Sequence, residues 1–156
     1  GIRGPIAPLG MCNGLMVPIV YFDQLYSFDR ATLQKSLPRP KDVSPSAFAD
    51  TAEELMDRIL QLADNAGSSD ADRALNYLAV RYERIYSATA EAHQRNQSVT
   101  SIDVRPTALT GARRLVDVVF SYTDRSTDVV DRSAVRVDVT EEFPYLVSKL
   151  SPYTER

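Results

Sequence analysis

Residues 70–104 read DADRALNYLAVRYERIYSATAEAHQRNQSVTSIDV, and this stretch decides the predicted fold. From Asp70, a residue suited to a helix N-cap, apolar side chains recur with the 3.6-residue period of an amphipathic helix as far as about His93. After Asn96 the period changes to 2, which is typical of a strand with one buried face. The change of period predicts an α+β fold in which the helices precede the strands.

A second helix is expected immediately upstream. Ser44 supplies an oxygen that can cap free backbone amides, and Pro45 suits the first helical position. An apolar stripe follows to Ala63, and Gly67 can provide a left-handed stop. Because only a short Gly-Ser-Ser loop joins the two helices, we expect them to pack as an antiparallel pair.

A shorter helix is predicted over Tyr21–Leu37, where Phe22, Leu25, Tyr26, Leu33 and Leu37 suit one helical face. Pro38 and Pro40 forbid its continuation. The run from Val17 to Phe22, taken alone, also fits a strand.

Three antiparallel strands are expected in the C-terminal half. The apolar residues of one face are Ile102 and Val104, then Val116, Val118, Phe120 and Tyr122, then Val135, Val137 and Val139. The opposite face carries Asp103, Arg105, Asp117, Arg136 and Asp138. One face should therefore pack on the helices while the other meets water or a partner. The tail from Glu141 predicts a short helix or hook folded back on the core.

Length and composition indicate one domain spanning residues 1–156, with residues 1–16 as a linker or extended arm. The Gly-Ile-Arg-Gly-Pro start favours a domain cut from a longer protein. A formal charge of −3 offers no long-range attraction to nucleic acid or to anionic membranes. Because Cys12 is the single cysteine, no intrachain disulfide can form, which favours a reducing, cytoplasmic compartment.

The residues that usually carry catalysis or metal binding are scarce. The chain has one histidine, His93, and one cysteine, Cys12, in different segments, so we predict no metal site within one chain and no cofactor. No nucleophile motif or phosphate-binding loop occurs, and we assign no catalytic residue. The simplest interpretation of His93 is a helix end, where a cation suits the dipole.

Arg105, Arg113 and Arg114 flank a predicted turn over residues 107–111, where guanidinium groups and loop amides can hold a carboxylate or an acidic peptide. The alternative is a solvated basic loop that balances nearby acidic residues of the strands. Tyr77 lies off the apolar stripe of its helix and is a candidate for an exposed contact. These four residues form the predicted peptide- or partner-binding site.

Three segments carry a resemblance to a known family: NGLMVPIVYFDQ at 13–24, ALNYLA at 74–79 and VDVTEEFPYL at 137–146. From about Cys12 onward the chain resembles the C-terminal domain of unknown function of PatG-type proteins, the cyanobactin maturation protease and macrocyclase proteins of the patellamide pathway. The resemblance implies a domain attached behind a subtilisin-like protease that cleaves and cyclises a ribosomal precursor peptide in a cyanobacterium. No catalytic residue of that family matches a position here.

These observations favour a non-catalytic accessory domain that binds the precursor peptide, its modified product or another pathway protein. β-strand addition at an exposed sheet edge is one physical mode for such binding. Two alternatives remain: a homodimer that holds two protease copies together, and a peptide-modifying enzyme, an isomerase or hydrolase, whose site forms only in the fold.

Overall fold

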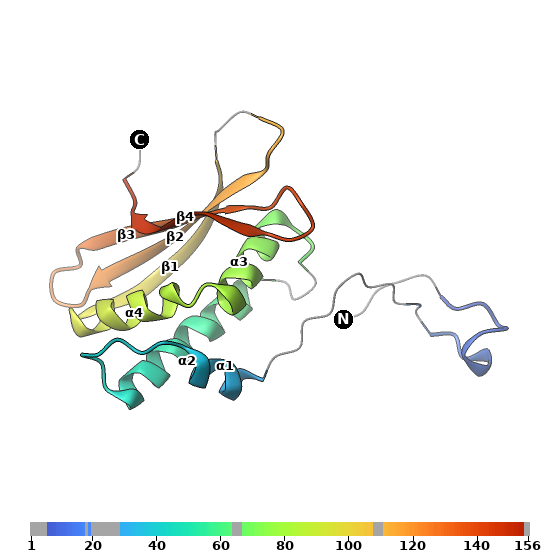
Figure 1. Ribbon diagram of the computed structural model, residues 1–156, viewed down its shortest axis with the longest axis horizontal. Coiled ribbons are helices and arrows are strands. Elements are labelled where there is room, and N and C mark those ends of the chain that lie inside the picture. The colour runs from blue at the N-terminus through green and yellow to red at the C-terminus, as the bar shows by residue number, and fades with distance from the viewer. Residues whose placement is uncertain (1–5, 18, 20–28, 64–66, 108–110, 155–156) are drawn as a thin grey trace.

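The computed structural model describes residues 6–17, 19, 29–63, 67–107 and 111–154 (Figure 1). Within these residues, a short 3-10 turn at Cys12–Gly14 is followed by four α-helices and then by four strands. The helices are α1 (Arg30–Ser36), α2 (Pro45–Leu62), α3 (Asp70–Arg81) and α4 (Arg84–Gln94). The strands are β1 (Gln97–Pro106), β2 (Leu115–Asp124), β3 (Val130–Asp138) and β4 (Tyr145–Pro152). The predicted α+β class is confirmed.

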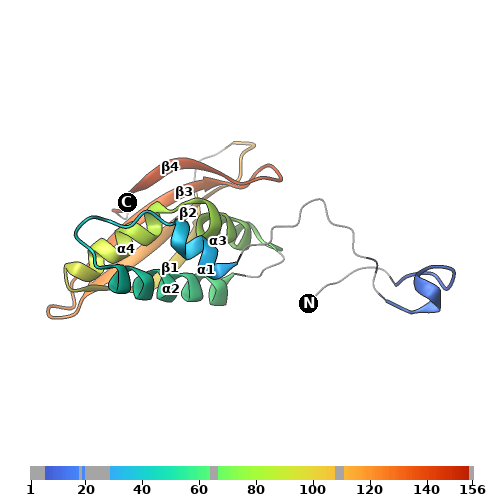
Figure 2. The same cartoon turned by 60° about the horizontal axis from the view of Figure 1, so that its bottom comes forward.

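The molecule has two layers, with the helices covering one face of the sheet (Figure 2). The strands form an antiparallel meander in the order β1-β2-β3-β4. The core lies between the layers and includes Leu55, Ile59, Leu78, Ile85, Tyr86, Val118, Phe120, Val135 and Val137, all fully buried. Strands β2 and β3 thus turn alternate apolar side chains toward the helices, as the period of 2 predicts.

The opposite face of the sheet carries charged side chains in cross-strand register. Arg105 of β1 is paired with Asp117 of β2, which is paired with Arg136 of β3. The Arg136 guanidinium donates two hydrogen bonds, 2.7 and 2.9 Å long, to the two oxygens of Asp117. The prediction of a charged face laced across the strands is confirmed for this pair. For Asp138, predicted on the same solvated face, it is wrong, because that carboxylate is buried with 1% exposed.

The single helix predicted from Asp70 to His93 is wrong, because the chain breaks it into α3 and α4. Tyr82 ends α3 with φ −120° and ψ 81°, outside the helical region. The break lets α3 contact β2 while α4 contacts β1. The apolar period continues through the break, so the sequence pattern could not show it. Together the two helices still run back along α2 (Figure 1).

The C-terminal tail forms the edge strand β4, not the predicted helix or hook, so the sheet has four strands instead of three. The register between β3 and β4 shifts twice, each time with one extra residue in β4. These bulges place Leu146 and Leu150 on the core side, with three exposed residues, 147–149, in succession between them. This spacing imitates a helical period and hides the alternation of a strand.

The helix starts follow local capping chemistry. Ser44 caps α2, and its Oγ accepts a hydrogen bond from the Ala47 amide at 3.3 Å. The cap of α3 is Ser69, not the predicted Asp70. Ser69 Oγ accepts from the Asp72 amide, and the Ser69 amide donates to the Asp72 carboxylate, both at 3.1 Å, which makes a reciprocal capping box.

Replacement of Ser69 by alanine should therefore lower the free energy of unfolding by about 1 kcal/mol, because the Asp72 amide loses its partner. Urea denaturation measures the change. Ser151→Ala, at an exposed serine of β4, is the control and should change stability by less than about 0.5 kcal/mol. Equal stability of the two variants would contradict the assigned cap.

The predicted end of α2 and the predicted extent of the first helix agree only in part with the structure. Helix α2 ends at Leu62, before Gly67, although Gly67 does adopt the predicted left-handed conformation with φ +62°. Of the helix predicted over Tyr21–Leu37, residues 30–36 form α1, and residues 20–28 lie outside the described part of the chain. Residues 6–17 form a local loop, closed by a 2.9 Å hydrogen bond from the Ala7 amide to the Val17 carbonyl.

Candidate functional site

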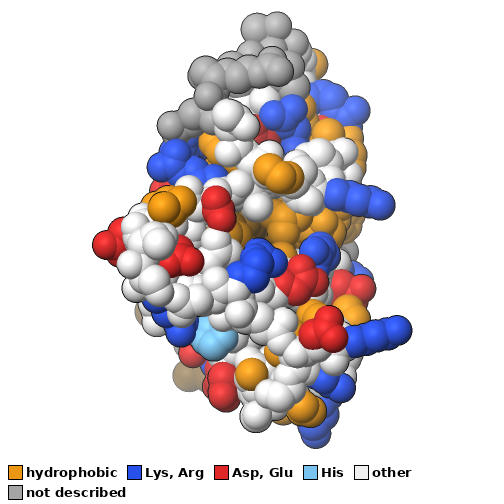
Figure 3. Space-filling model, turned by 90° about the vertical axis from the view of Figure 1, so that its left-hand side faces the viewer, with side chains coloured by type: hydrophobic (Ala, Val, Ile, Leu, Met, Phe, Trp, Pro, Cys, Tyr) orange, Lys and Arg blue, Asp and Glu red, His pale blue; other side chains and the backbone are white. Residues whose placement is uncertain are grey.

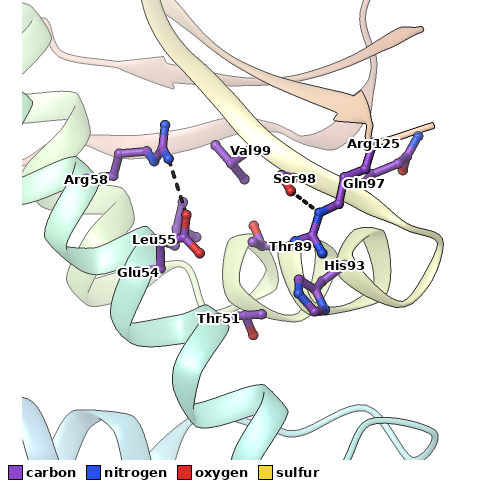
Figure 4. A pocket seen from close by; sticks show the side chains of 10 residues that line it. All are labelled: Thr51, Glu54, Leu55, Arg58, Thr89, His93, Gln97, Ser98, Val99 and Arg125. Carbon is purple, nitrogen blue, oxygen red and sulfur yellow. Dashed lines mark hydrogen bonds and ion pairs between the residues drawn. The ribbon is translucent and has the colours of Figure 1, made fainter. Parts of the chain in front are cut away.

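A polar hollow opens between α2, α4, the start of β1 and the β2–β3 connection (Figure 4). Its rim carries His93, Arg58, Glu54 and Arg125. The remaining lining residues are Thr51, Leu55, Thr89, Gln97, Ser98 and Val99. Figure 3 shows this end of the molecule, where the pale blue imidazole lies among interspersed cationic, anionic and apolar side chains. The single histidine therefore lies in the hollow beside charged side chains from distant segments of the chain.

Arg125 is held over the start of β1 by two hydrogen bonds. Its backbone amide donates to the Asn96 carbonyl at 3.0 Å, and its Nε donates to Ser98 Oγ at 2.6 Å. Within the described residues its two terminal nitrogens have no hydrogen-bond partner. In Figure 4 the guanidinium reaches toward His93, which projects from the last turn of α4. His93 thus ends a helix, as predicted.

On the opposite side of the hollow, α2 presents an ion pair. Arg58 Nη2 lies 3.2 Å from Glu54 Oε1, one helical turn away, and Arg58 Nη1 donates to the Thr100 carbonyl at 3.4 Å. Because Glu54 balances Arg58, the positive charge of Arg125 is the excess charge of the hollow. An anionic group is therefore favoured over a cationic one at the Arg125 side.

The size of the hollow limits what it can hold. Its cavity volume is about 10 Å³, and a second hollow between α1 and α2 has about 30 Å³. Sites for whole small molecules usually measure roughly 300–1,000 Å³. Neither hollow has the size of a substrate pocket, so each can receive only a single functional group.

The described residues contain no group of three His, Cys, Asp or Glu side chains placed to hold a metal ion. Within the same residues, no helix combines the length and the apolar character that a membrane span requires.

Arg113, one of the predicted binding residues, pairs with a buried carboxylate. Its Nε donates to Asp138 Oδ2 at 2.6 Å, and its guanidinium carbon lies 5.2 Å from the centre of the Tyr145 ring. Asp138 is 1% exposed and also accepts hydrogen bonds from the Thr140 amide at 2.9 Å and the Tyr145 hydroxyl at 3.2 Å. This arrangement ties the segment before β2 to the end of β3 and the start of β4.

Asp138 stays ionised at neutral pH in spite of its burial. Burial alone raises the pKa of its carboxyl. The hydrogen bonds from Thr140 and from Arg113, together with the positive charge of Arg113, outweigh that effect and hold the pKa below the usual value of an aspartate. The Arg113–Asp138 pair therefore stabilises the charged form.

Arg114, the second predicted residue, faces the start of α3. Its Nη1 donates to Asp70 Oδ1 at 2.8 Å, and its Nη2 donates to the Thr140 carbonyl at 3.1 Å. Asp70 also lies 3.6 Å from Arg73. Arg114 thus joins the β3–β4 connection to α3, a structural role that leaves its guanidinium already engaged.

Arg105 and Tyr77 complete the predicted set, and the structure places them in other surroundings. The Arg105 guanidinium carbon lies 5.8 Å from the centre of the Tyr153 ring, on the charged face of the sheet. Tyr77, expected to be exposed, is half-buried and packs against the core. Arg113 is held by the end of β3 and the start of β4, and Arg114 by the β3–β4 connection and α3, whereas Arg105 and Tyr77 have partners elsewhere.

The free edge of β4 exposes apolar side chains. Phe143 in the β3–β4 connection is 50% exposed, and Tyr145 and Val147 on the strand are 39% and 47% exposed. Within the described residues β4 pairs with β3 alone. Further along, the Leu150 amide donates to the Tyr82 hydroxyl at 3.0 Å, so α3 covers that part of the strand. The open edge is therefore limited to residues 145–149.

Comparison with known proteins adds the family. The family model described as PatG C-terminal matches residues 42–153, which run from just before α2 to just after β4. The chain belongs to the PatG C-terminal family. A search of curated proteins finds no match.

The fold of this PatG C-terminal domain also occurs in a solved structure described as "PatG Domain of Unknown Function". The TM-score is 0.66 at 19% sequence identity, and the match covers 90% of this chain. It covers 56% of the solved chain, so the present chain spans a little over half of that protein's length. At this identity the likeness establishes the fold alone.

Sequence reasoning missed both the polar hollow and the exposed edge of β4. The hollow combines residues of α2, α4, β1 and the β2–β3 connection that are up to 74 positions apart, from Thr51 to Arg125. No motif marks them. A signal for the edge does exist, because Phe143, Tyr145 and Val147 alternate, although the spacing of Leu146 and Leu150 favours a helix or hook.

Proposed function

We propose that this PatG C-terminal domain is a non-catalytic interaction domain that binds a peptide segment along the open edge of β4. The observation that carries the proposal is the apolar patch of Phe143, Tyr145 and Val147 beside the edge residues 145–149. An edge strand offers unpaired backbone groups to an extended peptide, and apolar side chains next to it add contact area.

The chemistry of the patch favours a peptide with apolar residues. Burying a Phe or Val side chain is worth roughly 1.5–3 kcal/mol, so two such contacts support micromolar binding when some backbone hydrogen bonds are added. The bulges of β4 and the Tyr82 contact keep the added strand short. A short contact suits transient binding more than permanent assembly.

The family resemblance suggests which peptide binds. PatG-type proteins mature a ribosomal precursor peptide, so the precursor, its modified product or another pathway protein is the proposed partner. Holding such a segment near a protease domain would raise its local concentration there.

The test is a fluorescence anisotropy titration of the domain with labelled leader and core segments of a precursor peptide. We expect saturable binding to at least one segment, and Val147→Asp should weaken it about tenfold because the patch loses apolar contact and gains a charge. Val129→Asp is the matched control: Val129 is 59% exposed on the β2–β3 connection, at the opposite end of β3, and its change should leave binding intact.

Two outcomes would contradict the proposal. Saturable binding that survives Val147→Asp would place the peptide elsewhere. No binding to any segment, together with a dimer that Val147→Asp dissociates in sedimentation experiments, would make the patch an interface between copies of this chain.

A further inference from the structure

We propose that the polar hollow beside His93 binds a single carboxylate group, either a peptide C-terminus or an acidic side chain. This site lies at the β1 side of the sheet and is independent of the proposed peptide contact at β4. The Nε of Arg125 is engaged by Ser98, while its two terminal nitrogens have no partner within the described residues. That end of a guanidinium matches the two oxygens of a carboxylate.

The position of Arg125 is determined before any ligand arrives. The bond to Ser98 Oγ and the amide bond to the Asn96 carbonyl hold the residue at the start of β1. Below it, Thr51, Leu55, Thr89 and Val99 of the lining are each more than nine-tenths buried. The buried lining and the anchored Arg125 lose little conformational freedom when a ligand binds. This preorganisation favours binding.

His93 adds a second donor on the same side. Its ring projects from α4 toward the Arg125 guanidinium in Figure 4 and makes no hydrogen bond within the described residues. An imidazole N–H there can donate to one carboxylate oxygen while Arg125 donates to the other. Two donors from different elements, α4 and the β2–β3 connection, then converge on one group.

The charges around the hollow agree with an anion. Its lining contains Arg58, Arg125 and a single acid, Glu54, which is paired with Arg58. The C-terminal end of α4 carries the negative end of the helix dipole, which disfavours an anion. Its last carbonyls, however, already accept hydrogen bonds. The amide of Arg95 donates to the carbonyls of Glu91 and Ala92, and the amide of Asn96 donates to that of His93.

The volume of the hollow fits the inference as well. About 10 Å³ is space for roughly one water-sized atom, so at most one carboxylate oxygen enters the hollow while the other stays at its rim, and a nucleotide or a ring is too large. The rest of any ligand would stay on the surface. Because the cations are solvent-exposed, we expect dissociation constants in the millimolar range for an isolated carboxylate.

The experiment is an NMR titration of the whole chain with three blocked peptides. Acetyl-trialanine presents a C-terminal carboxylate, acetyl-glutamate amide presents a side-chain carboxylate, and acetyl-trialanine amide presents none. Because His93 is the single histidine, its ring resonances report on this site alone. We expect saturable shifts of the His93 ring and of the Arg125 Nε–H with at least one carboxylate, and none with the amide; the stronger of the two identifies the source.

Variants make the assignment specific. Arg125→Gln should weaken carboxylate binding about fivefold, and His93→Gln should weaken it by a smaller factor while the backbone spectrum stays folded. Lys35→Gln, at an exposed cation of α1, is the matched control and should have no effect. Equal shifts with the amide, no shifts with either carboxylate, or unchanged affinity in Arg125→Gln would overturn the proposal.

Discussion

Replacement of Arg73 by alanine is expected to lower the free energy of unfolding by about 3 kcal/mol. The guanidinium of this α3 residue donates to three carbonyls of the β3–β4 connection: Val139 at 2.7 Å, Glu142 at 2.9 Å, and Glu141. Hydrogen bonds that involve a charged donor each contribute roughly 1.5–3 kcal/mol, and water replaces part of what is lost. The variant removes three hydrogen bonds that link α3 to the β3–β4 connection.

Urea denaturation measures this change, and amide hydrogen exchange shows where it acts. We expect protection to fall first in β4, because its connection is no longer held to α3. The matched control is Arg84→Ala, which breaks an exposed ion pair with Glu91 at 2.8 Å and should cost less than about 1 kcal/mol. If Arg73→Ala is no more harmful than Arg84→Ala, the link does not carry the stability assigned to it.

Replacement of Asp138 by alanine should cost about 2–3 kcal/mol at neutral pH. The carboxylate is 1% exposed and accepts hydrogen bonds from Arg113, Thr140 and Tyr145. Its removal leaves these donors without their partner at the start of the β3–β4 connection, and removing one member of a buried pair is more harmful than removing a surface charge. Thermal unfolding measures the effect, with Asp103→Ala, at an exposed acid of β1, as control.

The effect should depend on pH in a defined direction. Because the pKa of Asp138 is lower in the folded protein than in the unfolded chain, its contribution is fully present above the unfolded value of about 3.9. The contribution is lost as the pH falls through the folded pKa. The difference between wild type and Asp138→Ala should therefore be constant from pH 5 to 7 and shrink in strongly acidic solution. A difference that grows on acidification would contradict the assigned sign.

The local signals of the sequence predicted the helical half well. Ser44 and Pro45 begin α2 where capping chemistry places them, and the apolar period identifies the residues of α2, α3 and α4 that face the core. The break at Tyr82 could not be predicted, because the apolar side chains keep their helical spacing across it. Contact with the sheet determines where the two helices pack: α3 lies against β2, and α4 lies against β1.

The predicted binding residues show a different limit. The sequence identifies Arg113 and Arg114 as a basic pair beside a turn, and it equally allows a ligand site or a structural role. Only the fold brings Asp138 and Asp70 to within 2.6 and 2.8 Å of them. In the polar hollow the situation is reversed: its residues have no common signal in the sequence, and the fold alone brings His93 and Arg125 together.

The amino-acid sequence by itself determined the α+β class, the order of helices before strands, the buried and charged faces of β1 to β3, and the family. These features follow from periodicity and capping, which act between residues a few positions apart. The tertiary structure decided the fourth strand, the division of the long helix and the pairing of the arginines. It also decided the polar hollow and the open edge of β4. Their physical cause is contact between distant segments, which burial and hydrogen bonding fix only once the helices pack on the sheet.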